Sequence, residues 1–190
     1  MPLDHRHPLV RSAFGTGLAL LSGARLGLQG AELRSGVRLG SVSAALVTAG
    51  VVGSAAIPAV RAGMRARTLP VPAWKWLLVD IPLGTVWPEE AVYRGALGTV
   101  TADVFGPQLG RLLQAVVFGL SHIPNARGTG EPVLPTVIVT GAAGWVLGWL
   151  ATYSGSLLAP ALAHLAINEA GAVTALLVAR GGHVATVGLE

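Results

Sequence analysis

The sequence predicts an all-α protein, a polytopic transmembrane helix bundle of about five or six helices. Two observations carry this prediction. Hydrophobic residues make up 52% of the 190-residue chain, whereas charged residues make up only 12%. A soluble domain has about 25% charged residues because its surface faces water, so half that fraction indicates a surface that faces lipid. The stretches 39–60 and 132–163 contain no charge, and each is long enough to cross a bilayer, which takes about 20 apolar residues.

The expected helices alternate with short turns. Pro82 and Pro88 each remove a backbone donor, so we expect the long helix that contains them to bend at one of the two. Ser156 can cap the last helix with its hydroxyl. The expected elements are, in order, a weak N-terminal segment at 10–28, a span at 39–60, a basic loop at 61–68, helices at 73–104 and 108–123, a loop at 125–132, and spans at 133–153 and 157–179.

We divide the chain into three parts. Residues 1–68 hold the N-terminal helices and the basic loop, residues 69–180 form the main helix bundle, and residues 181–190 are a polar tail that we expect to be disordered. Arginines at the ends of apolar segments are typical of cytoplasmic loops and not of a nucleic-acid surface. We therefore expect an integral protein of the plasma (inner) membrane that contacts lipid and binds no nucleic acid. The absence of cysteine excludes a thiol nucleophile.

Polar side chains interrupt the apolar helices. An ionisable group near the bilayer centre costs about 2.5–3.5 kcal/mol if it is left unpaired, and several of them would cost on the order of 10 kcal/mol. We therefore expect these groups to face one another or a water-filled cavity. They are Glu89, Glu90, Arg94, His122, His164, Asn168 and Glu169.

Helical spacing indicates how some of these side chains group. Glu90 and Arg94 lie one turn apart, so we expect an ion pair between them. Glu89 lies about 100° around the same helix and is free to point elsewhere. His164 and Asn168 repeat the one-turn spacing, and so do Phe118 and His122.

The depth of these groups can be calculated at about 1.5 Å of rise per residue. Glu89 and His122 each lie roughly 25 Å from the turn at Gly106, so an antiparallel helix pair brings them level. His164 and Asn168 lie roughly 12 and 18 Å from the turn that precedes the last helix. We therefore expect the four side chains to converge. If the basic loop is cytoplasmic, they lie in the cytoplasmic half of the bilayer.

Three segments resemble the motifs of one known family. Residues 89–95 (EEAVYRG) resemble its EExxxR motif, residues 118–122 (FGLSH) its FxxxH motif, and residues 164–168 (HLAIN) its HxxxN motif. The family is the CAAX prenyl protease and bacteriocin-processing (CPBP, ABI-type) family of intramembrane endopeptidases. The resemblance covers residues 74–179, over half of the chain. Each motif alone is a weak signal, but three in order on apolar helices are specific.

The resemblance implies a catalytic mechanism and a class of substrate. Glu89 and His122 would orient and deprotonate a water molecule, and His164 and Asn168 would donate hydrogen bonds to the oxyanion. One such donor is worth about 3–4 kcal/mol. The implied substrate is a membrane-anchored or lipidated peptide or protein, since similar eukaryotic proteins remove a C-terminal tripeptide after a prenylated cysteine. Glu90, Arg94 and Phe118 would support the catalytic groups.

The same residues allow other interpretations. Glu89, His122 and His164 could coordinate zinc with a fourth position for water. We favour chemistry without a cofactor, because the chain has no HExxH sequence and the amide of Asn168 suits an oxyanion better than zinc. A non-catalytic membrane scaffold or an immunity protein of the same fold is the main alternative function. An ion-coupled transporter is a further alternative.

Overall fold

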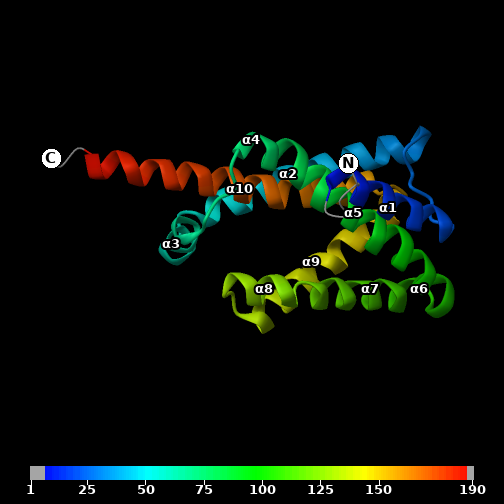
Figure 1. The fold of residues 1–190 in the computed structure, drawn as a ribbon. Coiled ribbons are helices and arrows are strands. Elements are labelled where there is room, and N and C mark those ends of the chain that lie inside the picture. Colours follow the sequence, from blue (N-terminus) through cyan, green and yellow to red (C-terminus); the bar gives the residue numbers. More distant parts are fainter. Residues whose placement is uncertain (1–6, 188–190) are drawn as a thin grey trace.

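The computed structural model describes residues 7–187, and the side chains of residues 7–180. Within that part of the chain every regular element is a helix (Figure 1), so the predicted all-α bundle is confirmed. Candidate membrane spans, judged by length and composition, are Gly30–Ser54, Val133–Ser154 and Leu158–Arg180. The helix Pro8–Leu21 is apolar but shorter.

The N-terminal region contains α1 (Pro8–Leu21), α2 (Gly30–Ser54) and α3 (Pro58–Ala66). Helix α2 begins nine residues before the expected start of the first span, and it ends six residues before the expected end. The segment predicted as a basic loop is largely helical, which corrects the prediction. Pro58 explains this difference, because a proline in the first helical turn has a backbone already suited to a helix and lacks a donor that would go unused.

Residues 73–105 form one continuous helical rod, as expected, but its hydrogen bonding changes along its length. The rod consists of α4 (Ala73–Lys75), η1 (Trp76–Asp80), η2 (Pro82–Val86), α5 (Trp87–Glu89), η3 (Glu90–Leu97) and α6 (Gly98–Phe105), where η denotes wider π-helical turns. Pro82 opens one π segment, and Pro88 lies just before another. Wider turns of this kind are frequent at functional sites.

The C-terminal half contains α7 (Pro107–Ser121), α8 (Ile123–Thr129), α9 (Val133–Ser154) and α10 (Leu158–Val187). Two predictions are corrected here. The loop expected at 125–132 is mostly the short helix α8, because Pro124 falls in its first turn, where a proline is tolerated. Helix α10 continues to Val187, so residues 181–187 of the expected tail are helical, and residues 188–190 lie outside the described part. The predicted cap is confirmed, since the backbone amide of Leu158 donates to Ser156 Oγ at 3.2 Å.

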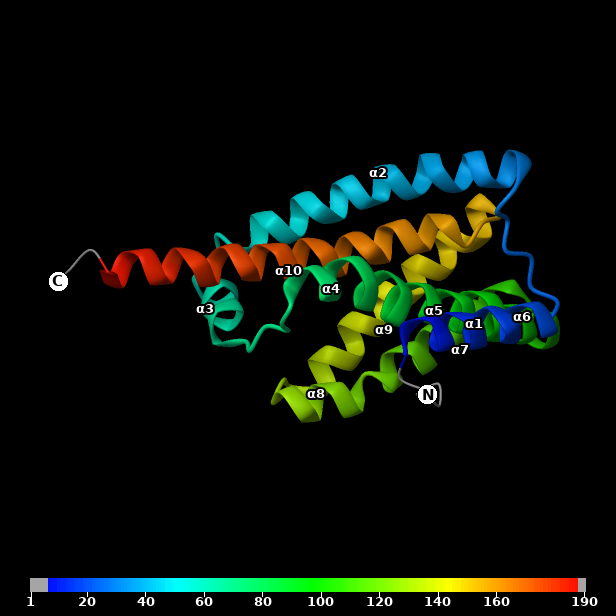
Figure 2. The same ribbon diagram turned by 45° about the horizontal axis from the view of Figure 1, so that its top comes forward.

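Two helix pairs build most of the bundle. Helices α2 and α10 lie side by side, and α7 packs along α9 (Figures 1 and 2). Glycines allow the first pair to approach closely, because a Cβ atom on Gly40 would lie only 3.0 Å from Ala159 Cα. The apolar core includes Leu147, Leu150, Ala159 and Ala163 between α9 and α10. This packing holds α10 in place beside the rod of residues 73–105.

Helix α1 packs on the π-helical part of the rod. Ser12 Oγ donates to the carbonyl of Leu83 at 2.6 Å, and Trp87 Nε1 donates to Thr16 Oγ1 at 2.9 Å. Residue numbers rise together along the two elements, so α1 and the rod run parallel at this contact. A partly buried hydrogen bond at each end of the contact fixes the register of α1 against the segment that leads to Glu89.

Candidate active site

The four side chains predicted to be catalytic line one cavity of about 650 Å³. Glu89 comes from the end of α5, His122 from the junction of α7 and α8, and His164 and Asn168 from α10. The convergence expected from helical rise is therefore confirmed, although their roles in catalysis are not tested by it. The cavity is also lined by residues that the sequence did not single out: Arg11, Phe14, Thr85, Pro88, Val92, Tyr93, Ser121 and Asn125.

His164 lies between two carboxylates. Its Nδ1 atom is 2.7 Å from Glu90 Oε1, and its Nε2 atom is 3.9 Å from Glu89 Oε2. A carboxylate oxygen accepts, so Nδ1 carries the proton of the shorter contact. Helical spacing suggested that Glu89 and Glu90 point in different directions, and the structure refines this: they approach the same imidazole from its two nitrogens.

Glu90 and Arg94 form the predicted ion pair inside the protein. Arg94 Nη1 donates to Glu90 Oε1 at 3.2 Å, and neither side chain has exposed surface. Arg94 Nη2 also donates to the carbonyl of Gly144 at 3.4 Å. The same carbonyl accepts from Gln114 Nε2 at 2.9 Å. Buried charges need such partners, because an isolated one costs several kcal/mol.

The ring of Phe118 packs against several of the residues that line the cavity. It meets Tyr93, His122 and His164 edge-to-face, with centroids 5.0, 4.7 and 6.0 Å away. The guanidinium carbon of Arg94 lies 4.1 Å from the ring centroid, which is a cation–π contact. Phe118 is 2% exposed, so one rigid side chain positions both histidines and the buried arginine.

His122 has one nitrogen fixed by the backbone. Its Nδ1 atom is 2.8 Å from the carbonyl oxygen of Phe118, one turn earlier in the chain. A carbonyl can only accept, so Nδ1 carries a proton and neutral His122 presents Nε2 as an acceptor. An imidazole in this tautomer can accept a hydrogen bond from a water molecule.

Asn168 is held through its own helix. Its Nδ2 atom donates to the carbonyl of His164 at 3.1 Å. An amide nitrogen has two protons, so a second donor is left for a group in the cavity. Glu169, the next residue, does not line this cavity. It lines a separate groove of about 480 Å³ with Arg61 and apolar residues of α2 and α10.

A zinc ion does not fit the observed side chains. Among the residues that the structure describes, no three His, Cys, Asp or Glu side chains are grouped closely enough to hold one metal ion. Nδ1 of His122 and of His164 is engaged by the protein, which leaves Nε2 of each as the nitrogen that could reach a metal, but Glu89 approaches only His164 within 4 Å. We therefore derive no step through a metal, and metal independence stays a prediction.

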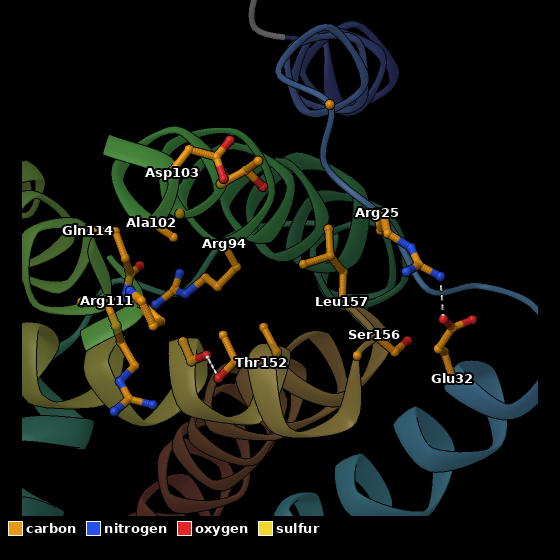
Figure 3. A pocket seen from close by; sticks show the side chains of 17 residues that line it. Arg25, Glu32, Arg94, Ala102, Asp103, Arg111, Gln114, Thr152, Ser156 and Leu157 are labelled. Carbon is orange, nitrogen blue, oxygen red and sulfur yellow. Dashed lines mark hydrogen bonds and ion pairs between the residues drawn. The ribbon is translucent and has the colours of Figure 1, made fainter. Parts of the chain in front are cut away.

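A second polar cavity lies next to the buried arginine (Figure 3). It measures about 400 Å³, and Arg94 is the only predicted site residue among the described residues that line it. Gln114 also lines it and is 1% exposed. Gln114 was not among the predicted site residues, although a glutamine at this point of an apolar helix indicates a buried hydrogen-bond partner.

The fold and the site together define a membrane-embedded helical protein with a cavity lined by a carboxylate, two imidazoles and an amide. The chain belongs to the family described as type II CAAX prenyl endopeptidase Rce1-like, whose profile matches residues 70–170, more than half of its length. The predicted relationship to the CAAX prenyl proteases is therefore confirmed. Comparisons with curated proteins and with solved structures find no match. The protein is thus an integral membrane protein of a protease family.

Proposed function

We propose that this protein is an intramembrane endopeptidase that hydrolyses a peptide bond by a water molecule activated between Glu89 and His122. The observation that carries the proposal is the convergence of Glu89, His122, His164 and Asn168 on one cavity. Glu89 is 22% exposed, so it has contact with that cavity while the protein surrounds most of its side chain.

In the proposed reaction, Glu89 and His122 act together on one water molecule. Glu89 takes a proton from the water, while Nε2 of His122 accepts a hydrogen bond from the same water and orients it. The water oxygen bonds to the peptide carbonyl carbon, and negative charge develops on the carbonyl oxygen. The C–N bond then breaks, and the proton on Glu89 passes to the leaving nitrogen. Atoms and charge balance without a metal.

The developing oxyanion needs donors. The free amide proton of Asn168 is one donor, and loss of such a donor typically costs about 3–4 kcal/mol of transition-state stabilisation. His164 is the proposed second donor. Because Glu90 already accepts the proton on Nδ1, His164 can donate from Nε2 only as an imidazolium. Glu90 and Arg94 are positioning residues that hold His164 through this contact.

The proposed substrate is a prenylated, membrane-anchored peptide or protein. The name of the matching family supports this class, and so does the position of the cavity among apolar helices. A lipid anchor holds the substrate at the membrane, so its peptide bond reaches the cavity by diffusion within the membrane plane.

We further propose that the active site opens toward the cytoplasmic side of the plasma (inner) membrane. Helix α3 brings Arg61 and Arg65 to one end of the bundle, and Arg67 follows directly. Arg67 forms an ion pair with Glu131, which places the loop after α8 at the same end. Cations close to membrane spans favour the cytoplasmic side. Labelling of introduced cysteines with an impermeant reagent tests this, since the chain has none of its own.

Proteolysis by the purified protein in liposomes is the test. Farnesylated and unmodified membrane-anchored peptides are incubated with wild type, with Glu89→Gln and with Glu169→Gln as a control, and products are identified by mass spectrometry. Glu169 is a matched control because it is a glutamate on an apolar helix that lines a different groove. We expect cleavage by wild type and by Glu169→Gln, and a loss of at least 100-fold in Glu89→Gln.

A chelator arm separates metal-free from metal-dependent chemistry. We expect full activity after treatment with a strong zinc chelator. Loss of activity that returns on addition of zinc would contradict the metal-free mechanism and leave the protease function intact. A protein that cleaves no peptide, but whose cellular role survives Glu89→Ala, is the outcome that favours a scaffold or immunity function.

A further inference from the structure

An apolar groove of about 330 Å³ runs between α7 and α9 on the outside of the bundle. None of the described residues that line it is charged, and several of them, such as Leu112 and Ile138, are exposed. From Leu112 to Leu120 the groove extends along α7 for about 12 Å of helical rise. It shares no described residue with the catalytic cavity or with the groove that contains Glu169.

The groove lies within the membrane and ends near one membrane surface. Helix α9 is a candidate span, Val133–Ser154, and the α9 residues of the groove wall lie at 137–145, inside that span. Arg111, in the second turn of α7, is level with Gly148, since a Cβ atom on Gly148 would lie 3.1 Å from Arg111 Cγ. Arg111 is therefore close to the end of the span, where hydrocarbon gives way to lipid headgroups.

Arg111 places a positive charge at this end of the groove. Its guanidinium carbon lies 4.6 Å from the ring centroid of Trp145, which is part of the groove wall. Figure 3 shows its side chain extending away from Arg94 and Gln114. Its Nη2 atom donates to the neutral amide of Gln108 at 2.6 Å, and no described carboxylate forms an ion pair with it. The guanidinium thus keeps an uncompensated charge and further donors for a ligand.

We propose that this groove binds an acyl chain of an anionic phospholipid whose phosphate is held by Arg111. The planar guanidinium matches phosphate oxygens, and the apolar wall matches a hydrocarbon chain. The order of the two parts is also that of a lipid, with the charge at the membrane surface and the chain directed inward. Trp145 lies between them, as aromatic rings do at headgroup depth. This inference does not depend on the proposed protease function.

The absence of a carboxylate partner favours a lipid with net negative charge. In a zwitterionic lipid the ammonium group offsets the charge of the phosphate, so the attraction to a nearby arginine is weaker. In an anionic lipid such as phosphatidylglycerol, Arg111 supplies the missing counter-charge. A basic side chain close to an anionic membrane surface contributes this kind of selectivity.

A lipid in this groove would join the two helices that support the buried arginine. Helix α7 carries Phe118, whose ring contacts Arg94, and α9 carries Gly144, whose carbonyl accepts from Arg94. A ligand that binds only the folded protein stabilises it in proportion to its occupancy. We therefore expect the lipid to raise the melting temperature of the purified protein.

Two other occupants of the groove differ from this one in measurable ways. Lipid that merely surrounds the bundle fills a groove whatever its headgroup is. The isoprenoid chain of a substrate needs no phosphate at Arg111, and a farnesylated peptide would then displace the bound lipid. Free phosphate would bind at Arg111 without needing the groove.

The test is native mass spectrometry of the purified protein, released from micelles that contain equal amounts of phosphatidylglycerol and phosphatidylcholine with identical chains. The variants are Arg111→Gln, Ala142→Phe and the control Arg34→Gln. Ala142 lines the groove, so a phenylalanine there fills it, whereas Arg34 is an exposed arginine on α2 that lines none of the cavities described above.

We expect wild type and Arg34→Gln to retain one phosphatidylglycerol with a preference of about tenfold over phosphatidylcholine, which is the size of one charge-assisted contact. In Arg111→Gln the preference should fall to about one, and in Ala142→Phe both lipids should be lost. Melting curves measured in parallel show that each variant is folded. Phosphatidylglycerol should raise the melting temperature of wild type but not that of Arg111→Gln.

Several results would overturn the inference. Equal retention of the two lipids by wild type, or an unchanged preference in Arg111→Gln, would show that Arg111 does not select the headgroup. Displacement of the lipid by a farnesylated peptide would assign the groove to the substrate. Stabilisation by inorganic phosphate alone, to the same extent as by phosphatidylglycerol, would show that no lipid chain is needed.

Discussion

His164 Nδ1 lies 2.7 Å from Glu90 Oε1, although 74 residues separate the two in the sequence. This contact joins α10 to the π-helical turn that begins at Glu90, and the same carboxylate oxygen accepts from Arg94. A single buried oxygen thus links a histidine that lines the cavity to a buried arginine. The ion pair expected from the EExxxR spacing is therefore part of a three-residue network.

Substitutions in this network should destabilise the fold more than substitutions elsewhere. Glu90→Gln leaves the guanidinium of Arg94 buried without its carboxylate, and breaking a buried ion pair in this way costs about 3–5 kcal/mol. The double variant Glu90→Leu/Arg94→Leu removes both charges and should lose less stability than the two single variants predict in sum. Thermal unfolding of the purified proteins in detergent measures both effects. A Glu90→Gln variant with the wild-type melting temperature would show that the pair does not stabilise the protein.

The aromatic ring of Phe118, and not only its volume, should contribute to stability and to kcat. Phe118→Leu keeps an apolar side chain but removes the surface that Arg94 and two histidines contact, so we expect a loss of about 2 kcal/mol in stability and a lower kcat. Phe105→Leu is the matched control, because Phe105 is 54% exposed at the end of α6. Equal effects of the two substitutions on unfolding and activity would refute this role.

His122 should be needed for activity and not for folding. It is only partly buried, and its contacts are with Ser121 and Phe118, its near neighbours in the sequence, so it joins no distant segments through a hydrogen bond. His122→Ala should therefore lower kcat by at least 100-fold while the melting temperature stays close to that of wild type. Cleavage rates and unfolding curves from the same preparation give both numbers. If activity and stability fall together, the histidine supports the structure and need not act on water.

Close approach of α2 to α10 should depend on Gly40. In Gly40→Val the new side chain meets Ala159 and Leu162, so the helices must separate, at a cost of about 1–3 kcal/mol. Gly50→Val has the same helix propensity cost on the same helix, but no atom lies within 4 Å of its Cβ position. We expect a lower melting temperature for the first variant only. Indistinguishable melting curves would mean that this contact is not tight in the membrane.

The helices and the main site residues could be predicted because both have strong local signals in the sequence. Long uncharged runs predicted the spans, and i, i+4 spacing on apolar helices predicted which polar side chains face inward. The predictions were wrong at 61–66 and 125–129, where parts of short helices replace predicted loops. In both places a proline lies in the first turn of the new helix, where its missing backbone donor is not needed.

Other features were not predictable from one sequence, because they depend on contacts between distant segments. The bond from His164 to Glu90 requires the exact rotation of α10 against the rod, which helical spacing does not determine. The position of Arg11 depends on the hydrogen bonds from Ser12 to Leu83 and from Trp87 to Thr16, which join segments 71 residues apart. The π-helical turns around Glu89 likewise have no sequence signal beyond the two prolines.

The proposed active site requires that Glu89 and His164 meet in one cavity inside the membrane, and cysteine cross-linking measures this directly. The chain contains no cysteine, so only introduced thiols react. We predict that the pair Glu89→Cys/His164→Cys is joined rapidly in liposomes by a short bifunctional thiol reagent, with the linked peptides identified by mass spectrometry. The pair Glu89→Cys/Glu169→Cys should not be joined, because Glu169 lines the separate groove between α2 and α10. Failure of the first pair, or equal linkage of both, would contradict the proposed active site.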